Sequence, residues 1–248
     1  MKSILGLTLV LLLNVFVNAQ TNDLLPNKAF IVERQTLASQ THPNRALVLW
    51  MTDPKKNPRE STDEIYTCPE ETRGSYYSGP TRVSLIDTNT NKVINTIEIR
   101  EEETDSFDLP YKIHRTPYYY VTHFDQHGEG KPQIMHLRDF NGDGKALEFA
   151  LFDAEACMGL NTTLIGYSEK QDRVIQYPIV LETNGKTETD SSFWADYLFS
   201  EKPVRPGVWQ YEIDYRGRAG TLDKYQIHYN ANKERFEGTL ISTDEDSK

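Results

Sequence analysis

Several features that would assign a biochemical class are scarce or missing in this sequence. No apolar run after the N-terminus approaches the roughly 20 residues that a membrane-spanning helix needs. Basic residues are outnumbered, with 27 Lys and Arg against 37 Asp and Glu. Because nucleic acids are bound by basic surfaces, this balance argues against a nucleic-acid partner. The sequence also has no phosphate-binding glycine loop and no G-x-S-x-G hydrolase motif, so no catalytic residue is assigned.

Cysteine is also rare, since Cys68 and Cys157 are the only two in the chain. In an oxidising compartment the simplest expectation is a single disulfide between them. Two unpaired buried thiols are the alternative. Neither cysteine has an adjacent histidine that would activate it, so a catalytic thiol is not indicated.

The first nineteen residues have the layout of a secretory signal peptide. A basic residue, Lys2, precedes an apolar run over residues 4–17, and the small-residue sequence VNA ends at residue 19. The run is too short to span a bilayer. We therefore expect residues 1–19 to be removed and the mature chain to be secreted or periplasmic.

Short alternations of apolar and polar residues run through the chain, a pattern typical of strands with one buried face. Residues 82–88 and 92–99 predict a hairpin, and residues 208–215 with 224–229 predict a second one with an aromatic face. Further strands are predicted at 30–37, 46–51, 118–124, 134–137, 163–167 and 173–181.

Helical periodicity is scarce. Residues 147–159 contain good helix formers, but the alternation at their start favours a strand. Residues 191–200 predict one or two helical turns. Residues 53–63, with two prolines and many polar side chains, predict a mobile excursion.

These patterns predict a single all-β domain over residues 20–240. We expect an antiparallel meander forming a sandwich or an open barrel, with a small propeller-like array as the alternative. The acidic residues 241–248 predict a disordered tail.

The stretch DFNGDGKALE carries the most specific chemical pattern in the chain. Asp139, Asn141 and Asp143 supply oxygens at alternate positions, and a glycine follows. Hard cations take six to eight oxygens at about 2.3–2.6 Å, and a tight loop directs alternate side chains at one centre. The backbone carbonyl of Lys145 adds one more oxygen. The predicted Ca²⁺ ligands are therefore these four residues and Glu148.

This core resembles the calcium loop of EF-hands and, more closely, the DxNxDG loop of integrin-type (FG-GAP or VCBS) repeats, which lies between two strands of a propeller blade. The resemblance covers the loop alone and implies calcium, not an activity. The acid at position 12 of an EF-hand is replaced by Ala150, and the acid at position 9 of an integrin-type loop by Leu147. Glu148 completes the site if the chain bulges by one residue. Otherwise Asp153, Glu155 or a carboxylate from elsewhere must do so, or the site stays open to water.

Other patterns leave alternatives open. The Asn-Gly and Asp-Gly pairs of the same stretch are turn signals even without a metal. His123, Asp125 and His127, with His136 nearby, have residue types that bind transition metals, although a solvated hairpin end explains them equally. The tyrosines at 118–120 have the chemistry of a carbohydrate-stacking face.

The function expected from the sequence is that of a secreted or periplasmic, calcium-stabilised binding or structural protein, with an unidentified protein or carbohydrate ligand. The alternative is a secreted hydrolase, for example one acting on carbohydrate. The binding role is favoured because the carboxylates of the loop are committed to an ion and are not free for acid–base chemistry.

Overall fold

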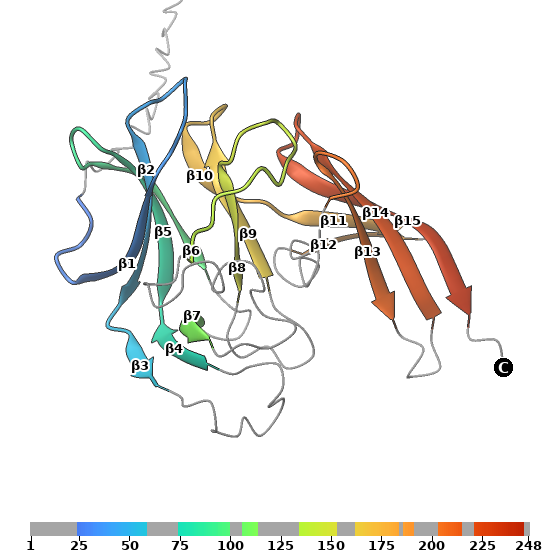
Figure 1. Ribbon diagram of the computed structural model, residues 1–248, viewed down its shortest axis with the longest axis horizontal. Coiled ribbons are helices and arrows are strands. Elements are labelled where there is room, and N and C mark those ends of the chain that lie inside the picture. The colour runs from blue at the N-terminus through green and yellow to red at the C-terminus, as the bar shows by residue number, and fades with distance from the viewer. Residues whose placement is uncertain are drawn as a thin grey trace, which may run out of the picture.

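The computed structural model describes residues 24–58, 74–99, 106–113, 134–152, 162–183, 186–190, 203–214 and 221–245. Regular structure in these ranges is strand throughout, without a helix. The strands form four sheets, none closed into a barrel (Figure 1). The predicted all-β class is thereby confirmed. Within the same ranges, no helix has the length and hydropathy needed to cross a membrane.

Several predicted features lie outside the described residues. They are the signal peptide at 1–19, both cysteines, the strand at 118–124 and the helical turns at 191–200.

The N-terminal sheet has the strand order β1-β2-β5-β6, with antiparallel neighbours. Its strands are β1 (Ala29–Thr36), β2 (Arg45–Thr52), β5 (Thr81–Asp87) and β6 (Val93–Ile99). The pairing of β5 with β6 confirms the first predicted hairpin. Strand β2 is buried on both faces, because Leu47 and Leu49 enter one core cluster and Val48 and Trp50 enter another.

A small sheet of order β3-β4-β7 extends the N-terminal half of the fold (Figure 1). Its strands are β3 (Lys55–Asn57), β4 (Gly74–Gly79) and β7 (Phe107–Ile113). Strand β3 lies inside the segment predicted as a mobile excursion. Its Lys55 and Lys56 side chains are exposed, but the backbone pairs with β4, so the prediction of a mobile loop is wrong over these residues.

The central sheet has the order β10-β9-β8 and is covered on both faces. Its strands are β8 (Glu148–Phe152), β9 (Thr162–Ser168) and β10 (Arg173–Gln176). Phe149 and Ile165 pack into the core shared with the N-terminal sheet, whereas Ala150 and Leu164 pack against the C-terminal sheet. Because side chains alternate along a strand, β8 and β9 serve two cores at once. The preference for strand over helix at the start of 147–159 is confirmed.

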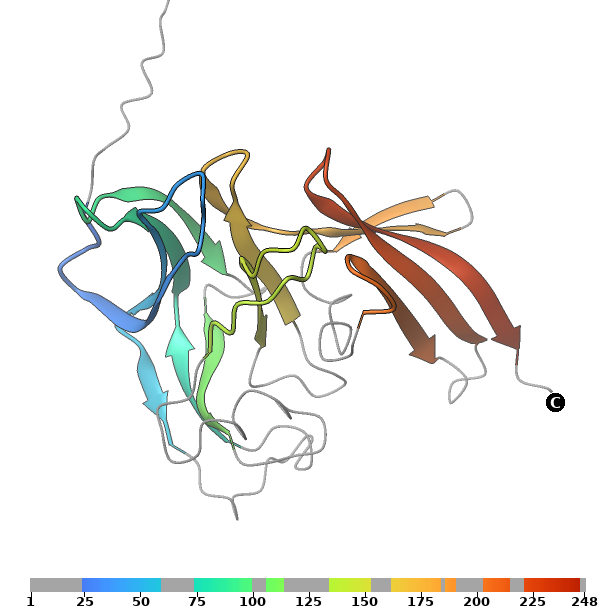
Figure 2. The same ribbon diagram turned by 45° about the horizontal axis from the view of Figure 1, so that its top comes forward.

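The C-terminal sheet has the order β12-β11-β15-β14-β13 (Figure 2). Its strands are β11 (Ile179–Thr183), β12 (Lys186–Asp190), β13 (Val208–Asp214), β14 (Thr221–Asn230) and β15 (Arg235–Glu245). The pairing of β13 with β14 confirms the second predicted hairpin. Strands β11 and β15 are parallel, so the described chain is not a pure antiparallel meander.

Three predictions at the level of single elements need correction. Residues 241–245, predicted as disordered tail, belong to β15, where they pair with residues 221–224 of β14. Residues 134–137 are not a strand, because the backbone N–H groups of Ile134 and Met135 donate to the carboxylate of Glu33 instead of to a neighbouring strand. The run 173–181 is two strands, which separate at residues 177–178.

Candidate cation site

The two ends of the predicted cation loop are hydrogen-bonded to each other beside the central sheet. Arg138 and Glu148 exchange both backbone hydrogen bonds, Arg138 N to Glu148 O at 2.7 Å and Glu148 N to Arg138 O at 3.2 Å. Glu148 is also the first residue of β8. The nine residues between them therefore form a loop whose two ends are fixed relative to each other.

Asp139 organises the first half of this loop. Its Oδ1 accepts hydrogen bonds from the backbone N–H groups of Gly142 at 2.7 Å and Asp143 at 3.0 Å, and its Oδ2 accepts one from Gly144 at 2.9 Å. Gly142 and Gly144 have φ angles of +80° and +86°, which favour glycine. A carboxylate oxygen has more than one lone pair, so Asp139 retains acceptor capacity for a cation.

The second half of the loop continues the same pattern. The side-chain oxygen of Asn141 accepts the N–H of Asp143 at 2.9 Å, and Asp143 Oδ1 accepts the N–H of Lys145 at 2.9 Å. The Lys145 ammonium donates to the carboxylate of Glu169 in the β9–β10 turn. The Lys145 side chain is thereby engaged outside the loop, and its backbone carbonyl is the group of this residue that could serve as a cation ligand.

Glu148 lies beneath the loop and is completely buried, with an exposed fraction of 0%. Its Oε2 accepts the N–H of Phe140 at 3.1 Å, and its Oε1 accepts the side-chain amide of Asn141 at 2.9 Å. Burial raises the pKa of Glu148 to about 9, and the nearby carboxylates of Asp143 and Asp139 act in the same direction. Hydrogen bonds from the backbone N–H groups of Phe140 and Asn141 oppose this increase. Glu148 is thus a carboxyl group held without a neutralising hydrogen-bond partner.

The residues that stand where other calcium loops carry acids have a structural role instead. Leu147 has an exposed fraction of 2% and packs into the core between the N-terminal and central sheets. Ala150 is buried in the core on the opposite side. Acids at these two positions would lose hydration without a partner, which explains why the carboxylate falls at Glu148.

The carboxylates do not by themselves form a metal cage. No group of three or more His, Cys, Asp and Glu side chains within the described ranges is arranged to hold a metal ion. A hard cation in this loop would depend on neutral oxygens as well, namely the Asn141 amide and the Lys145 carbonyl, together with water. The donor chemistry of the loop, all oxygen, fits calcium and does not fit a transition metal.

The alternative metal site falls almost entirely outside the described chain. His123, Asp125 and His127 are not described, and neither are the tyrosines at 118–120 or the acids Asp153 and Glu155. His136 is described and lies three residues before the loop.

One partner of the loop was not apparent from the sequence. The loop packs against the turn that leads into β13, where a Cβ on Gly142 would lie 2.3 Å from the backbone nitrogen of Gly207. Trp209 at the start of β13 donates from Nε1 to the carbonyl of Phe140 at 3.2 Å. These residues are more than sixty positions apart in the chain, so only tertiary structure brings them together.

Comparisons with known proteins add no relative: no protein-family model matches the sequence, and no curated protein or solved structure shows significant similarity to it.

Proposed function

We propose that this chain is a secreted or periplasmic β-protein that binds Ca²⁺ through the loop from Asp139 to Glu148 and acts as a binding or structural module. The observation that carries the proposal is the placement of Glu148. A fully buried carboxyl group is costly unless a positive charge or sufficient hydrogen bonds compensate for its lost hydration. Both of its hydrogen-bond partners are neutral groups, and two further carboxylates lie in the same loop.

In the proposed site, Asp139, Asn141, Asp143, the Lys145 carbonyl and Glu148 hold the ion. Calcium favours the ionised form of the buried Glu148 over its protonated form and offsets the repulsion among the carboxylates. Its role is to stabilise the junction of the sheets. The affinity expected for an extracellular module of this kind is on the order of 10⁻⁴–10⁻³ M.

The test compares melting temperatures in excess EDTA and in about 10 mM Ca²⁺. Binding with the affinity above raises the melting temperature by about 3–11 °C. Asp143→Asn removes one charge while keeping an acceptor for the Lys145 N–H, and this variant should lose the shift. The control is Asp53→Asn, since Asp53 is exposed and has a positive φ of 43° that asparagine tolerates. Equal melting temperatures of the native chain in EDTA and calcium would refute the calcium site.

Secretion and the disulfide belong to the same proposal. Cleavage of the signal peptide leaves a mature chain that begins at Gln20, which N-terminal sequencing of the exported protein checks. A bond between Cys68 and Cys157 protects both thiols from alkylation until a reductant is added. Alkylation of both thiols in the unreduced protein would remove the disulfide from the proposal without affecting the calcium site.

A further inference from the structure

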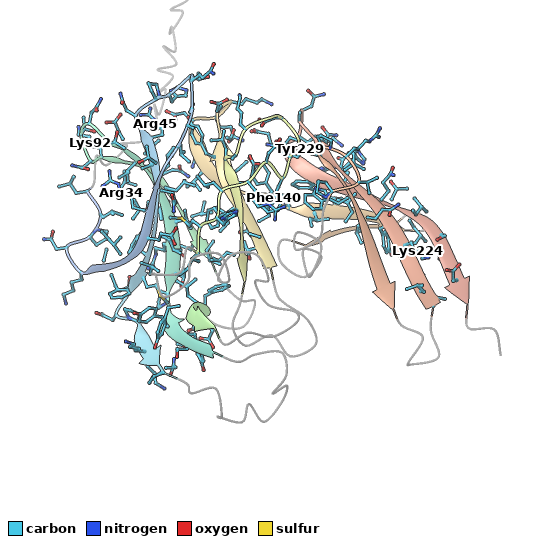
Figure 3. The ribbon with its side chains drawn as sticks, viewed as in Figure 1. Arg34, Arg45, Lys92, Phe140, Lys224 and Tyr229 are labelled. Atoms are coloured by element: carbon cyan, nitrogen blue, oxygen red, sulfur yellow. The ribbon has the colours of Figure 1, made fainter. Side chains whose placement is uncertain are left out.

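The cation loop is in direct contact with the C-terminal sheet through a buried tryptophan. Trp209 has an exposed fraction of 1%, and its indole N–H donates to the carbonyl of Phe140 at 3.2 Å. The two rings also pack, with centroids 5.7 Å apart. Phe140 is labelled in Figure 3, where it lies between the central and C-terminal sheets. Strand β13 therefore contacts the loop through both a polar and an apolar contact.

The position of Phe140 makes this contact relevant to the ion. Phe140 stands between the proposed ligands Asp139 and Asn141 in the sequence. Its N–H donates to Glu148 at 3.1 Å, while its carbonyl accepts from Trp209. Phe140 thus joins three proposed ligands to β13. Displacement of Trp209 would remove the hydrogen bond to the Phe140 carbonyl.

A second contact lies on the other side of Asn141. Gly142 and Gly207 approach so closely that a Cβ on Gly207 would lie 2.3 Å from the carbonyl oxygen of Asn141. Gly207 is in turn fixed to the C-terminal sheet, because its carbonyl accepts the N–H of Tyr229 at 3.0 Å. The loop therefore rests on an anchored turn with no room for a side chain between the two backbones.

We propose that the Gly207 turn and Trp209 hold the cation loop in its binding conformation, so that calcium binding and docking of the C-terminal sheet onto the loop strengthen each other. This inference rests on the calcium site proposed above. Trp209 is a positioning residue, since it acts on the ligands through its contacts with Phe140. Coupling between two equilibria is reciprocal, so docking strengthens calcium binding by the same factor by which calcium strengthens docking.

The experiment is a calorimetric titration with CaCl₂ of the mature chain and of two tryptophan variants. Trp209→Phe removes the hydrogen bond to Phe140 while keeping an aromatic ring. Trp50→Phe is the matched control, because Trp50 is also buried and donates from Nε1, at 2.8 Å to Ser84 in the N-terminal sheet. We expect Trp209→Phe to weaken calcium binding about five- to tenfold, the equivalent of one hydrogen bond, and Trp50→Phe to leave it unchanged.

Hydrogen exchange of the native chain provides a second measurement that needs no variant. Calcium should slow exchange of the amides between β13 and β14 by more than it slows exchange between β5 and β6. Equal calcium affinities of all three chains, or equal calcium effects on the two hairpins, would overturn the coupling while leaving the calcium site intact. A native chain that binds no calcium would overturn the site, and the coupling with it.

Discussion

Arg45 in β2 donates two parallel hydrogen bonds to Asp172 in the β9–β10 turn, from Nε to Oδ1 at 2.9 Å and from Nη2 to Oδ2 at 2.7 Å. The remaining amino group of Arg45 donates to Asp87 Oδ2 at 2.8 Å. Tyr167 completes the arrangement by donating its hydroxyl to Asp172 at 2.8 Å. A single guanidinium group thereby joins two strands of the N-terminal sheet to the central sheet.

Replacing Arg45 with alanine should lower the free energy of unfolding by about 2–3 kcal/mol, because charge-assisted bidentate bonds are among the stronger polar contacts. Arg34→Ala is the control. Arg34 lies exposed on β1 in the same sheet, and Figure 3 labels both arginines. Urea unfolding followed by circular dichroism measures both variants. A loss at Arg45 no larger than that at Arg34 would show that the sheets are held together without this contact.

Acid should destabilise the fold through carboxylates that are paired in it. Hydrogen bonds from Arg45 hold the pKa of Asp172 below its usual 3.8, and hydrogen bonds from Asn230, Lys233 and Arg235 lower the pKa of Glu237 to about 2. A depressed pKa favours the folded state above the unfolded pKa of about 4, and this contribution disappears as pH falls towards 2.

In EDTA the urea midpoint should therefore decrease below about pH 4, while the raised pKa of Glu148 should make it increase as the pH falls from 7 to about 5. Glu237→Gln cannot titrate, so the stability of this variant should depend less steeply on pH in the acid range. An equally steep decrease in this variant would show that Glu237 does not contribute.

Gly166 in β9 is predicted to tolerate no larger residue. A Cβ at this position would lie 2.7 Å from Cγ of Glu148 and 2.9 Å from Cε2 of Tyr177. Gly166→Ala should cost about 1–3 kcal/mol through overpacking. At Gly144 a Cβ would meet no atom within 4 Å, so Gly144→Ala bears only the cost of its positive φ, about 1 kcal/mol. Thermal unfolding in EDTA ranks the two variants without interference from bound ions, and the reverse ranking would contradict this packing.

The end of the chain offers a comparison between two truncations. A chain that ends at Glu245 keeps every residue of β15, whereas one that ends at Leu240 leaves Thr221 to Lys224 of β14 without their partners. The shorter chain also loses the ion pair between Lys224 and Asp244, at 3.6 Å. We expect the first truncation to match the full chain in melting temperature and the second to melt several degrees lower. Equal melting temperatures would restore the prediction of a tail that begins at residue 241.

The sequence predictions succeeded where the interactions are local in the chain and failed where they join distant segments. Both hairpins were recognised because alternation and a nearby turn are local signals. Residues 134–137 alternate in the same way, yet the N–H groups of Ile134 and Met135 donate to Glu33, about a hundred positions earlier in the chain. The sequence contains no local sign of that contact. The acidic composition of residues 241–245 likewise suggested a tail, although pairing with β14 holds them in a strand.

The candidate site shows the same difference between local and long-range contacts. Asp139, Asn141 and Asp143 could be selected from spacing alone because they form one turn. Glu148 was considered as the closing carboxylate, and its side chain does meet Asn141 at 2.9 Å. Trp209 could not be selected, since its contact with Phe140 depends on how the C-terminal sheet docks. A glycine and a tryptophan two residues apart, at 207 and 209, are too common a pattern to indicate it.

The position of β15 sets an order of events for folding. This strand follows β11 to β14 in the sequence, yet it lies between β11 and β14 in the interior of its sheet. Strand β11 therefore joins the β13–β14 hairpin only after β15 has taken its place. Contacts between distant segments also form slowly, because a long loop must close first. Until β15 is in place, the edges of β11 and β14 are open to pairing with other chains, which makes this stage of folding the one most exposed to aggregation.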